Sequence, residues 1–153
     1  MMTIEEVTSI LVEHHVLMCK ELAKKEGKKV TAKKIKALSN SYRMYLELYG
    51  LYRNIFPFFS EHGSVCIQNI VGIPTLEQPI RKKGYMHSLY VKPESRKHGK
   101  AFELMKVACG WAKANGYTEL FGATSPVSGK ICKKLGWYEI RKMMRLEFRQ
   151  EVK

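Results

Sequence analysis

The segment 89–101 constrains the fold most, because a short apolar strand there runs into a basic loop that opens a helix. It reads Leu-Tyr-Val-Lys-Pro-Glu-Ser-Arg-Lys-His-Gly-Lys-Ala. N–H groups at a helix start are unpaired and the helix dipole adds partial positive charge, so this site suits a phosphate or pyrophosphate. Gly99 lets the backbone approach an anion closely, and Ala101 is too small to block it. For the glycine alone, an ordinary strand–loop–helix connection is the simpler interpretation.

Length and composition indicate one folded domain. The chain has 153 residues, and the 45% that are hydrophobic are spread along it, which allows a sizeable core and argues against disorder. No apolar run approaches the length that spans a bilayer, and the N-terminus is acidic and amphipathic, unlike a signal or transit peptide. We therefore expect a cytoplasmic protein with no membrane association.

The cysteines indicate reduced thiols instead of a metal centre. Cys19, Cys66, Cys109 and Cys132 lie far apart and form no C-x-x-C pair. This spacing argues against a zinc site and is typical of small buried side chains. The sequence thus predicts no metal.

Basic charge is concentrated near the N-terminus. The formal net charge is +13, and eight lysines crowd one segment: Lys20, Lys24, Lys25, Lys28, Lys29, Lys33, Lys34 and Lys36. Such a field attracts nucleic acid, an acidic protein or an anionic cosubstrate. A solvated helical surface would show the same charges, so both interpretations stay open.

Two helices are predicted at the N-terminus. Thr3 with Glu6 forms a capping-box pattern, and Ile4, Val7, Leu11, Met18 and Leu22 keep helical spacing until Gly27. Thr31 can cap a second helix that ends at Gly50, with Ile35, Leu38, Tyr42, Tyr45 and Tyr49 on one face. The spacing of the tyrosines is typical of a buried face rather than a platform for bases.

Strands and helices alternate in the rest of the chain. We predict strands over 64–73, 85–91, 117–123, 137–140 and 144–149, with a turn over 74–84 and an aromatic loop or irregular strand over 51–63. A helix after the basic loop stops at Asn115–Gly116, and its expected core face is Phe102, Met105, Cys109 and Ala112. Ser125 should cap a short helix that Gly136 ends.

Three segments together resemble the GCN5-related N-acetyltransferase (GNAT) superfamily over about 85–148. The segment 89–94 looks like the family's fourth strand and its exit. Residues 96–101 match the pattern Arg/Gln-x-x-Gly-x-Gly/Ala, and Lys-Leu-Gly-Trp at 134–137 looks like the Lys-Leu-Gly-Phe turn. The resemblance implies an α/β (α+β) fold with a mixed, mostly antiparallel sheet, a central splayed parallel strand pair and helices on both faces. We expect a single domain over 1–153, with a helical acceptor-side half (1–63) and an acetyl-CoA-binding half (64–153).

The resemblance also implies where acetyl-CoA binds. Backbone groups of Leu89 and Val91 would pair with the pantetheine arm between the splayed strands, and N–H groups from Lys97 to Phe102 would hold the pyrophosphate. The predicted cosubstrate-binding residues are Leu89, Tyr90, Val91, Arg96, Lys97, His98, Gly99, Lys100, Ala101, Phe102, Ser125 and Ser128. Ser125 is equally well explained as a helix cap.

The proton-transfer residues depart from the family pattern. Many members carry a glutamate base on the fourth strand, where this chain has Tyr85, with His87 and Tyr90 nearby. Strand alternation places Tyr85, His87 and Leu89 on one face and Tyr90 on the other. His87 suits a base acting directly or through water, although a structural strand histidine is an equal alternative. The family's tyrosine acid is replaced by Cys132, which is also explained as a small buried side chain.

Two hypotheses about function follow. The first is an N-acetyltransferase in which an amine attacks acetyl-CoA directly, the acceptor being a macromolecule such as a protein or aminoacyl-tRNA. The second is a GNAT-like module that has lost catalysis and binds an acidic protein or nucleic acid through its basic face. The sequence also allows a homodimer.

Overall fold

The computed structural model describes residues 1–27, 29–71, 82–123 and 125–138. The chain divides into two compact units, 1–123 and 124–153, and the single-domain organisation stays a prediction. The first unit contains α1 (Ile4–Glu26), α2 (Ala32–Tyr49), β1 (Ile55–Ser60), β2 (Gly63–Val71), β3 (Lys82–Val91), a 3-10 turn η1 (Pro93–Ser95), α3 (Lys100–Ala114) and β4 (Tyr117–Phe121). The second unit contributes α4 (Pro126–Lys134).

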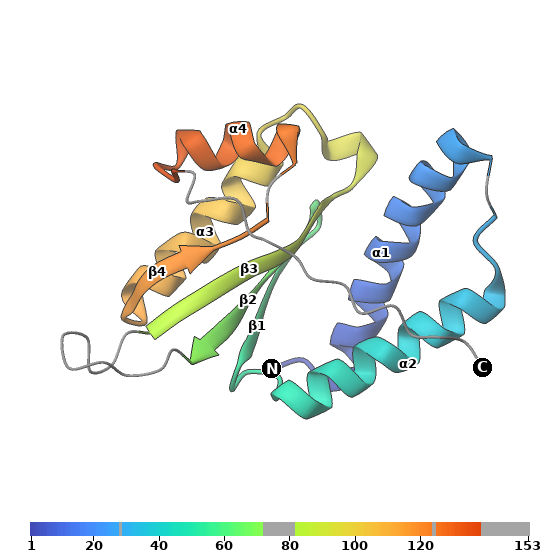
Figure 1. Ribbon diagram of the computed structural model, residues 1–153, viewed down its shortest axis with the longest axis horizontal. Coiled ribbons are helices and arrows are strands. Elements are labelled where there is room, and N and C mark those ends of the chain that lie inside the picture. The colour runs from blue at the N-terminus through green and yellow to red at the C-terminus, as the bar shows by residue number, and fades with distance from the viewer. Residues whose placement is uncertain (28, 72–81, 124, 139–153) are drawn as a thin grey trace, which may run out of the picture. The chain divides into compact units, whose positions relative to one another are not determined.

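The four described strands form one mixed sheet in the order β1-β2-β3-β4. Antiparallel pairs join β1 to β2 and β2 to β3, whereas β3 and β4 are parallel. Helices α1 and α2 pack together on one side of the sheet, and α3 contacts all four strands on the other (Figure 1). This confirms the predicted mixed sheet with helices on both faces.

The helix boundaries follow the local sequence signals. The Thr3 N–H donates to Glu6 Oε2 at 2.7 Å, and the Glu6 N–H donates to Thr3 Oγ1 at 3.2 Å, which completes the predicted capping box. Helix α1 ends at Gly27 in the left-handed conformation, with φ 68°. Thr31 caps α2, and Gly50 ends it, as predicted.

The aromatic run after α2 is a regular strand, which resolves the open interpretation of 51–63. Ile55 is fully buried with Cys66 in the core beneath α1 and α2. Phe56 and Phe58 lie on the opposite face, with ring centroids 4.6 and 5.3 Å from that of Trp111 on α3. Strand alternation thus lets one short strand contribute to the cores on both faces of the sheet.

Several predicted boundaries and faces were wrong. Strand β3 begins at Lys82, three residues before the prediction, and β4 ends at Phe121 instead of Ala123. On α3 the buried residues are Leu104, Met105, Ala108 and Ala112, whereas Phe102 and Cys109 are only half-buried. On α1, Met18 and Leu22 are exposed.

Parts of some predictions lie outside the described residues. These are most of the turn at 74–84, the strand at 144–149 and the second half of the strand at 137–140. In the described ranges, no helix combines the length and apolar character needed to cross a bilayer. Nor do three His, Cys, Asp or Glu side chains gather there in a way that could hold a metal ion.

Gly63, at the start of β2, should be intolerant of any side chain. A Cβ at this position would lie 2.0 Å from the Tyr90 carbonyl oxygen, a backbone atom that cannot move independently. We expect Gly63→Ala to lower the free energy of unfolding by roughly 2 kcal/mol or more, measured by urea denaturation. The matched control is Gly110→Ala on α3, where a Cβ meets nothing within 4 Å and helix propensity should raise stability by about 0.5–1 kcal/mol. Equal stability of the two variants would contradict this account.

Candidate functional site

A break in the register of β3 organises the site. Ser64 of β2 pairs with Tyr90, but Cys66 pairs with His87, so Ser88 and Leu89 together lie opposite one residue of β2. Ser88 has φ 54°, in the left-handed region that side chains rarely adopt. This is a β-bulge, which inserts one extra residue and reverses the alternation of faces beyond it.

The bulge overturns the predicted placement of Tyr90. Its ring stacks on His14 of α1 with centroids 4.7 Å apart, and His14 Nδ1 lies 2.7 Å from Ser64 Oγ. His87 contacts Tyr45 of α2, so both His87 and Tyr90 face the α1–α2 side of the sheet. The prediction of opposite faces assumed uninterrupted alternation, which the extra residue removes.

An open pocket of about 420 Å³ lies between α2 and strands β2 and β3. The residues that line it are Leu38, Ser41, Tyr42, Tyr45, Gln68, Tyr85, His87 and Ser88. Its wall is apolar and aromatic with a few neutral hydrogen-bonding groups, and none of these lining residues is a carboxylate. A mostly apolar pocket with few convergent polar groups is a typical small-ligand or substrate site.

Both ring nitrogens of His87 are hydrogen-bonded within this pocket. Nε2 lies 3.2 Å from Tyr45 Oη, and Nδ1 lies 2.9 Å from Ser88 Oγ. Tyr45 Oη in turn donates to Gln68 Oε1 at 3.0 Å. The Tyr85 ring lies over His87, with centroids 6.0 Å apart and planes inclined by 18°. The imidazole is thus held in one orientation by groups from α2, β2 and β3.

Burial controls the protonation of this cluster. Desolvation lowers the pKa of the His87 imidazole below the ordinary value of histidine, because burial disfavours the charged form. Burial likewise raises the pKa of Tyr45 to about 12. Near neutral pH the site therefore contains a neutral imidazole, able to accept a proton, beside a phenol that keeps its own.

The pairing of the two parallel strands ends at a residue that lines this pocket. The pairing of β3 with β4 runs from Lys82↔Tyr117 to Tyr85↔Phe121, whereas β3 continues to Val91. The last six residues of β3 therefore extend beyond the last pair with β4, and the splaying of the two strands stays a prediction. Leu89 and Val91 lie on this extension, where a bound chain could pair with their backbone groups.

The basic loop at the end of β3 presents the start of α3 without a side-chain cap. The first N–H to bond within this helix is that of Glu103, which donates to Gly99 O at 3.0 Å, so the N–H groups of Lys100, Ala101 and Phe102 precede it. Lys97 and Gly99 both have positive φ, 67° and 75°. A loop of this kind forms an anion-binding concavity.

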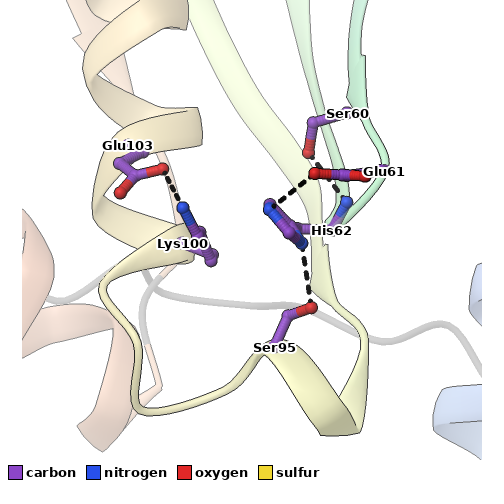
Figure 2. A network of polar contacts seen from close by, with 6 residues as sticks. All are labelled: Ser60, Glu61, His62, Ser95, Lys100 and Glu103. Atoms are coloured by element: carbon purple, nitrogen blue, oxygen red, sulfur yellow. Dashed lines mark hydrogen bonds and ion pairs between the residues drawn. The ribbon is translucent and has the colours of Figure 1, made fainter.

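The side chains of this loop have different surroundings. Arg96 donates to Glu21 of α1 through two bonds of 2.7 and 2.9 Å and to the Val91 carbonyl at 2.9 Å, so it ties the loop to α1. Lys100 pairs with Glu103 at 2.9 Å (Figure 2). Lys97 and His98 are exposed. Arg96 was predicted as a cosubstrate contact, and the structure shows that its guanidinium is already engaged by protein groups.

Figure 2 also shows how the β1–β2 turn supports the loop. His62 Nδ1 lies 3.0 Å from Ser95 Oγ, and its Nε2 lies 3.2 Å from a carboxylate oxygen of Glu61. The Lys92 N–H donates to the His62 carbonyl at 2.8 Å. These contacts hold η1 in place just before the start of α3.

Three predicted site residues belong to the second unit. The Ser125 N–H donates to Ser128 Oγ at 2.8 Å, and the Ser128 N–H donates to Ser125 Oγ at 3.2 Å. Both hydroxyls thus form a capping box for α4, which is the cap predicted for Ser125. Cys132 lies on α4, and burial raises the pKa of its thiol. A role in acetyl-CoA binding or acid catalysis stays a prediction for these three residues.

The comparisons with known proteins identify the family. The model of the acetyltransferase (GNAT) family matches residues 32–136, more than half of the chain. The chain belongs to the GNAT acetyltransferase family. No curated protein matches it significantly.

Solved structures share the fold of this GNAT chain. A predicted acetyltransferase from Clostridium acetobutylicum, crystallised with acetyl-CoA, has a TM-score of 0.70 at 20% identity and covers 94% of this chain and 91% of its own. A GCN5-related N-acetyltransferase from Ralstonia eutropha JMP134 has a TM-score of 0.69 at 18% identity, with 94% of each chain covered. An aminoglycoside 6'-N-acetyltransferase from Acinetobacter haemolyticus has a TM-score of 0.55 at 17% identity, covering 74% of this chain and 83% of its own. At these identities the likeness establishes the fold alone.

Sequence reasoning missed several residues of the pocket. Tyr42 and Tyr45 were assigned to the core from their spacing, and both also line the pocket. Gln68 and Ser88 carried no recognisable motif. Their role follows from pairing between strands and from the bulge, which a single strand's sequence does not reveal.

The buried histidines predict a loss of stability in acid. Desolvation lowers the pKa of both His14 and His87 in the folded protein. Between about pH 6.5 and these lowered pKa values, the unfolded chain therefore binds more protons than the folded chain. The free energy of unfolding is therefore highest above about pH 6.5. Below this pH it falls by up to about 1.4 kcal/mol per pH unit for each histidine that takes up a proton on unfolding.

This pH dependence can be measured by urea denaturation at pH 7.5, 6.5 and 5.5. We expect His87→Gln to flatten the decline, and the exposed His98→Gln control to keep the wild-type slope. Equal stability of the wild type at pH 7.5 and 5.5 would contradict the burial of these imidazoles.

Proposed function

We propose that this GNAT protein transfers the acetyl group of acetyl-CoA to an amine, with the strand–loop–helix segment holding the cosubstrate and the Tyr45–His87 pocket receiving the acceptor. The observation that carries the proposal is the arrangement of β3. One strand supplies His87 to the pocket, extends beyond β4, and leads into the uncapped start of α3.

The residues present fit acetyl-CoA. The pyrophosphate would lie against the N–H groups of Lys100 to Phe102, in the field of Lys97 and His98, and Gly99 would leave space for it. The pantetheine arm would pair with the backbone of Leu89 and Val91. An N–H in this stretch would also stabilise the negative charge that develops on the thioester oxygen.

Little covalent chemistry is required of the protein. The amine must be deprotonated and placed against the thioester carbonyl, and such positioning alone accounts for much of the acceleration. His87 is neutral because of its burial and is our candidate for the base. Tyr85 lies beside it in the pocket, and Cys132 remains the candidate proton donor for the departing thiolate.

The charge distribution supports a macromolecular, acidic acceptor. Six lysines of the basic N-terminal segment are exposed: Lys20, Lys24, Lys29, Lys33, Lys34 and Lys36. Together with the net charge of +13, they would attract an acidic protein or aminoacyl-tRNA and repel a polycation. The pocket lining contains no carboxylate for a multiply charged small amine. The four free cysteines suit our expectation of a cytoplasmic protein.

A second candidate is a binding module without catalysis. The observation that favours it is that both nitrogens of His87 are already bonded within the protein. In this case the chain would bind acetyl-CoA, or an acidic protein or nucleic acid on its basic face, without transferring the acetyl group. Transfer to an amine distinguishes the two candidates.

The loop can be tested by calorimetric titration with acetyl-CoA. We expect Gly99→Trp to weaken binding at least about tenfold, because the indole would fill the space of the pyrophosphate. Gly99→Ala is the matched control: it has the same unfavourable positive φ, but its Cβ meets nothing within 4 Å. If Gly99→Trp bound acetyl-CoA with wild-type affinity, this loop would not be the binding site of the pyrophosphate.

Activity is then measured as the release of free CoA thiol in the presence of acidic, neutral and basic peptides with free N-termini. We expect transfer to be fastest with the acidic peptides and to be lost in His87→Gln. Acetyl-CoA binding without transfer to any of these amines, or to aminoacyl-tRNA, would favour the binding module.

A further inference from the structure

The hydrogen-bond directions around His87 assign its basic nitrogen to one side of the ring. A phenol carries one proton, and Tyr45 donates its proton to Gln68 Oε1. The contact between Tyr45 Oη and His87 Nε2 therefore has the imidazole N–H as donor. The neutral ring then carries its lone pair on Nδ1, 2.9 Å from Ser88 Oγ.

The basic nitrogen of His87 thus meets a hydroxyl rather than the open pocket. The Ser88 hydroxyl donates to Nδ1, and Ser88 itself lines the pocket. An acceptor amine in the pocket can reach Nδ1 only by displacing Ser88 or by passing its proton through Ser88 Oγ.

We propose that Ser88 is a catalytic residue that relays the proton of the acceptor amine to His87. As the amine nitrogen gives a proton to Ser88 Oγ, the hydroxyl proton of Ser88 moves to His87 Nδ1. Ser88 ends the step as a neutral hydroxyl, and His87 becomes an imidazolium whose Nε2–H is still held by Tyr45. One proton has moved and no electron is gained or lost.

The β-bulge gives Ser88 a backbone conformation that is unfavourable for serine. With φ 54°, the position favours glycine, yet a hydroxyl is present and points to the imidazole. The bulge thus places the Ser88 hydroxyl between His87 and the pocket.

This inference rests on the proposed acetyl transfer, so the experiment separates the two. Two variants remove the hydroxyl with opposite effects on the backbone: Ser88→Ala keeps the strain, and Ser88→Gly relieves it. We expect both to lower kcat by roughly a hundredfold with the most active peptide, and to leave the KM for acetyl-CoA within about twofold. Ser88→Gly should nevertheless melt about 3 °C higher than Ser88→Ala, so that loss of activity cannot be attributed to loss of folding.

Two further variants complete the kinetic test. Ser88→Cys restores a group that can donate and accept a proton, and should recover part of the lost kcat. Thr118→Val removes a hydroxyl on β4 that donates to the Lys82 carbonyl outside the pocket, and should retain wild-type kcat. Wild-type kcat in both Ser88→Ala and Ser88→Gly, with activity lost in His87→Gln, would overturn the relay and leave acetyl transfer intact. A wild type without any transfer would instead defeat the proposed function.

The direction of the hydrogen bonds can be tested in the free protein, without an amine substrate. Nitrogen-15 NMR of the imidazoles distinguishes the two neutral tautomers. We expect His87 to carry its proton on Nε2, and Ser88→Ala to shift the Nδ1 resonance. A proton on Nδ1 would turn the lone pair toward Tyr45 and overturn the assignment of Ser88.

Discussion

The break in β3 pairing at Ser88 and Leu89 is the constraint on which the site depends. Without the extra residue, Tyr90 and His87 would lie on opposite faces, and Tyr90 could not stack on His14 of α1. The same irregularity turns the Ser88 hydroxyl to the imidazole. Because the pairing of β3 with β4 has already ended at Tyr85, the strand can change its face without disturbing the parallel pair.

The site combines two electrostatic environments at different ranges. Within the pocket, burial by neutral and aromatic groups keeps His87 uncharged and Tyr45 protonated, which is a short-range effect of lost hydration. Outside it, exposed lysines produce a positive field that acts over roughly a Debye length of about 8 Å at physiological salt. In the function that we propose, the first would set the protonation of the base, and the second would select which large acceptors approach.

The loop at the end of β3 is held by contacts that are far apart in sequence. Arg96 is fixed by Glu21 of α1, and Ser95 by His62 of the β1–β2 turn. An anion-binding turn made of backbone N–H groups gains from such support, since its donors are then positioned before the ligand arrives. The direct contact of Arg96 with acetyl-CoA stays a prediction, and its guanidinium ties the turn to α1.

The sequence by itself determined the features that depend on neighbouring residues. The capping box at Thr3, the caps at Thr31 and Ser125, the helix-ending glycines and the strand–loop–helix segment were predicted correctly because they rest on contacts within a few residues. The family was predicted from the resemblance that three such local segments carry, and the mixed sheet from what that resemblance implies. Tertiary structure alone decided which residues share the pocket. Tyr45, Gln68 and Ser88 meet His87 only because strands pair in a particular register, and one extra residue in β3 reverses every face beyond it.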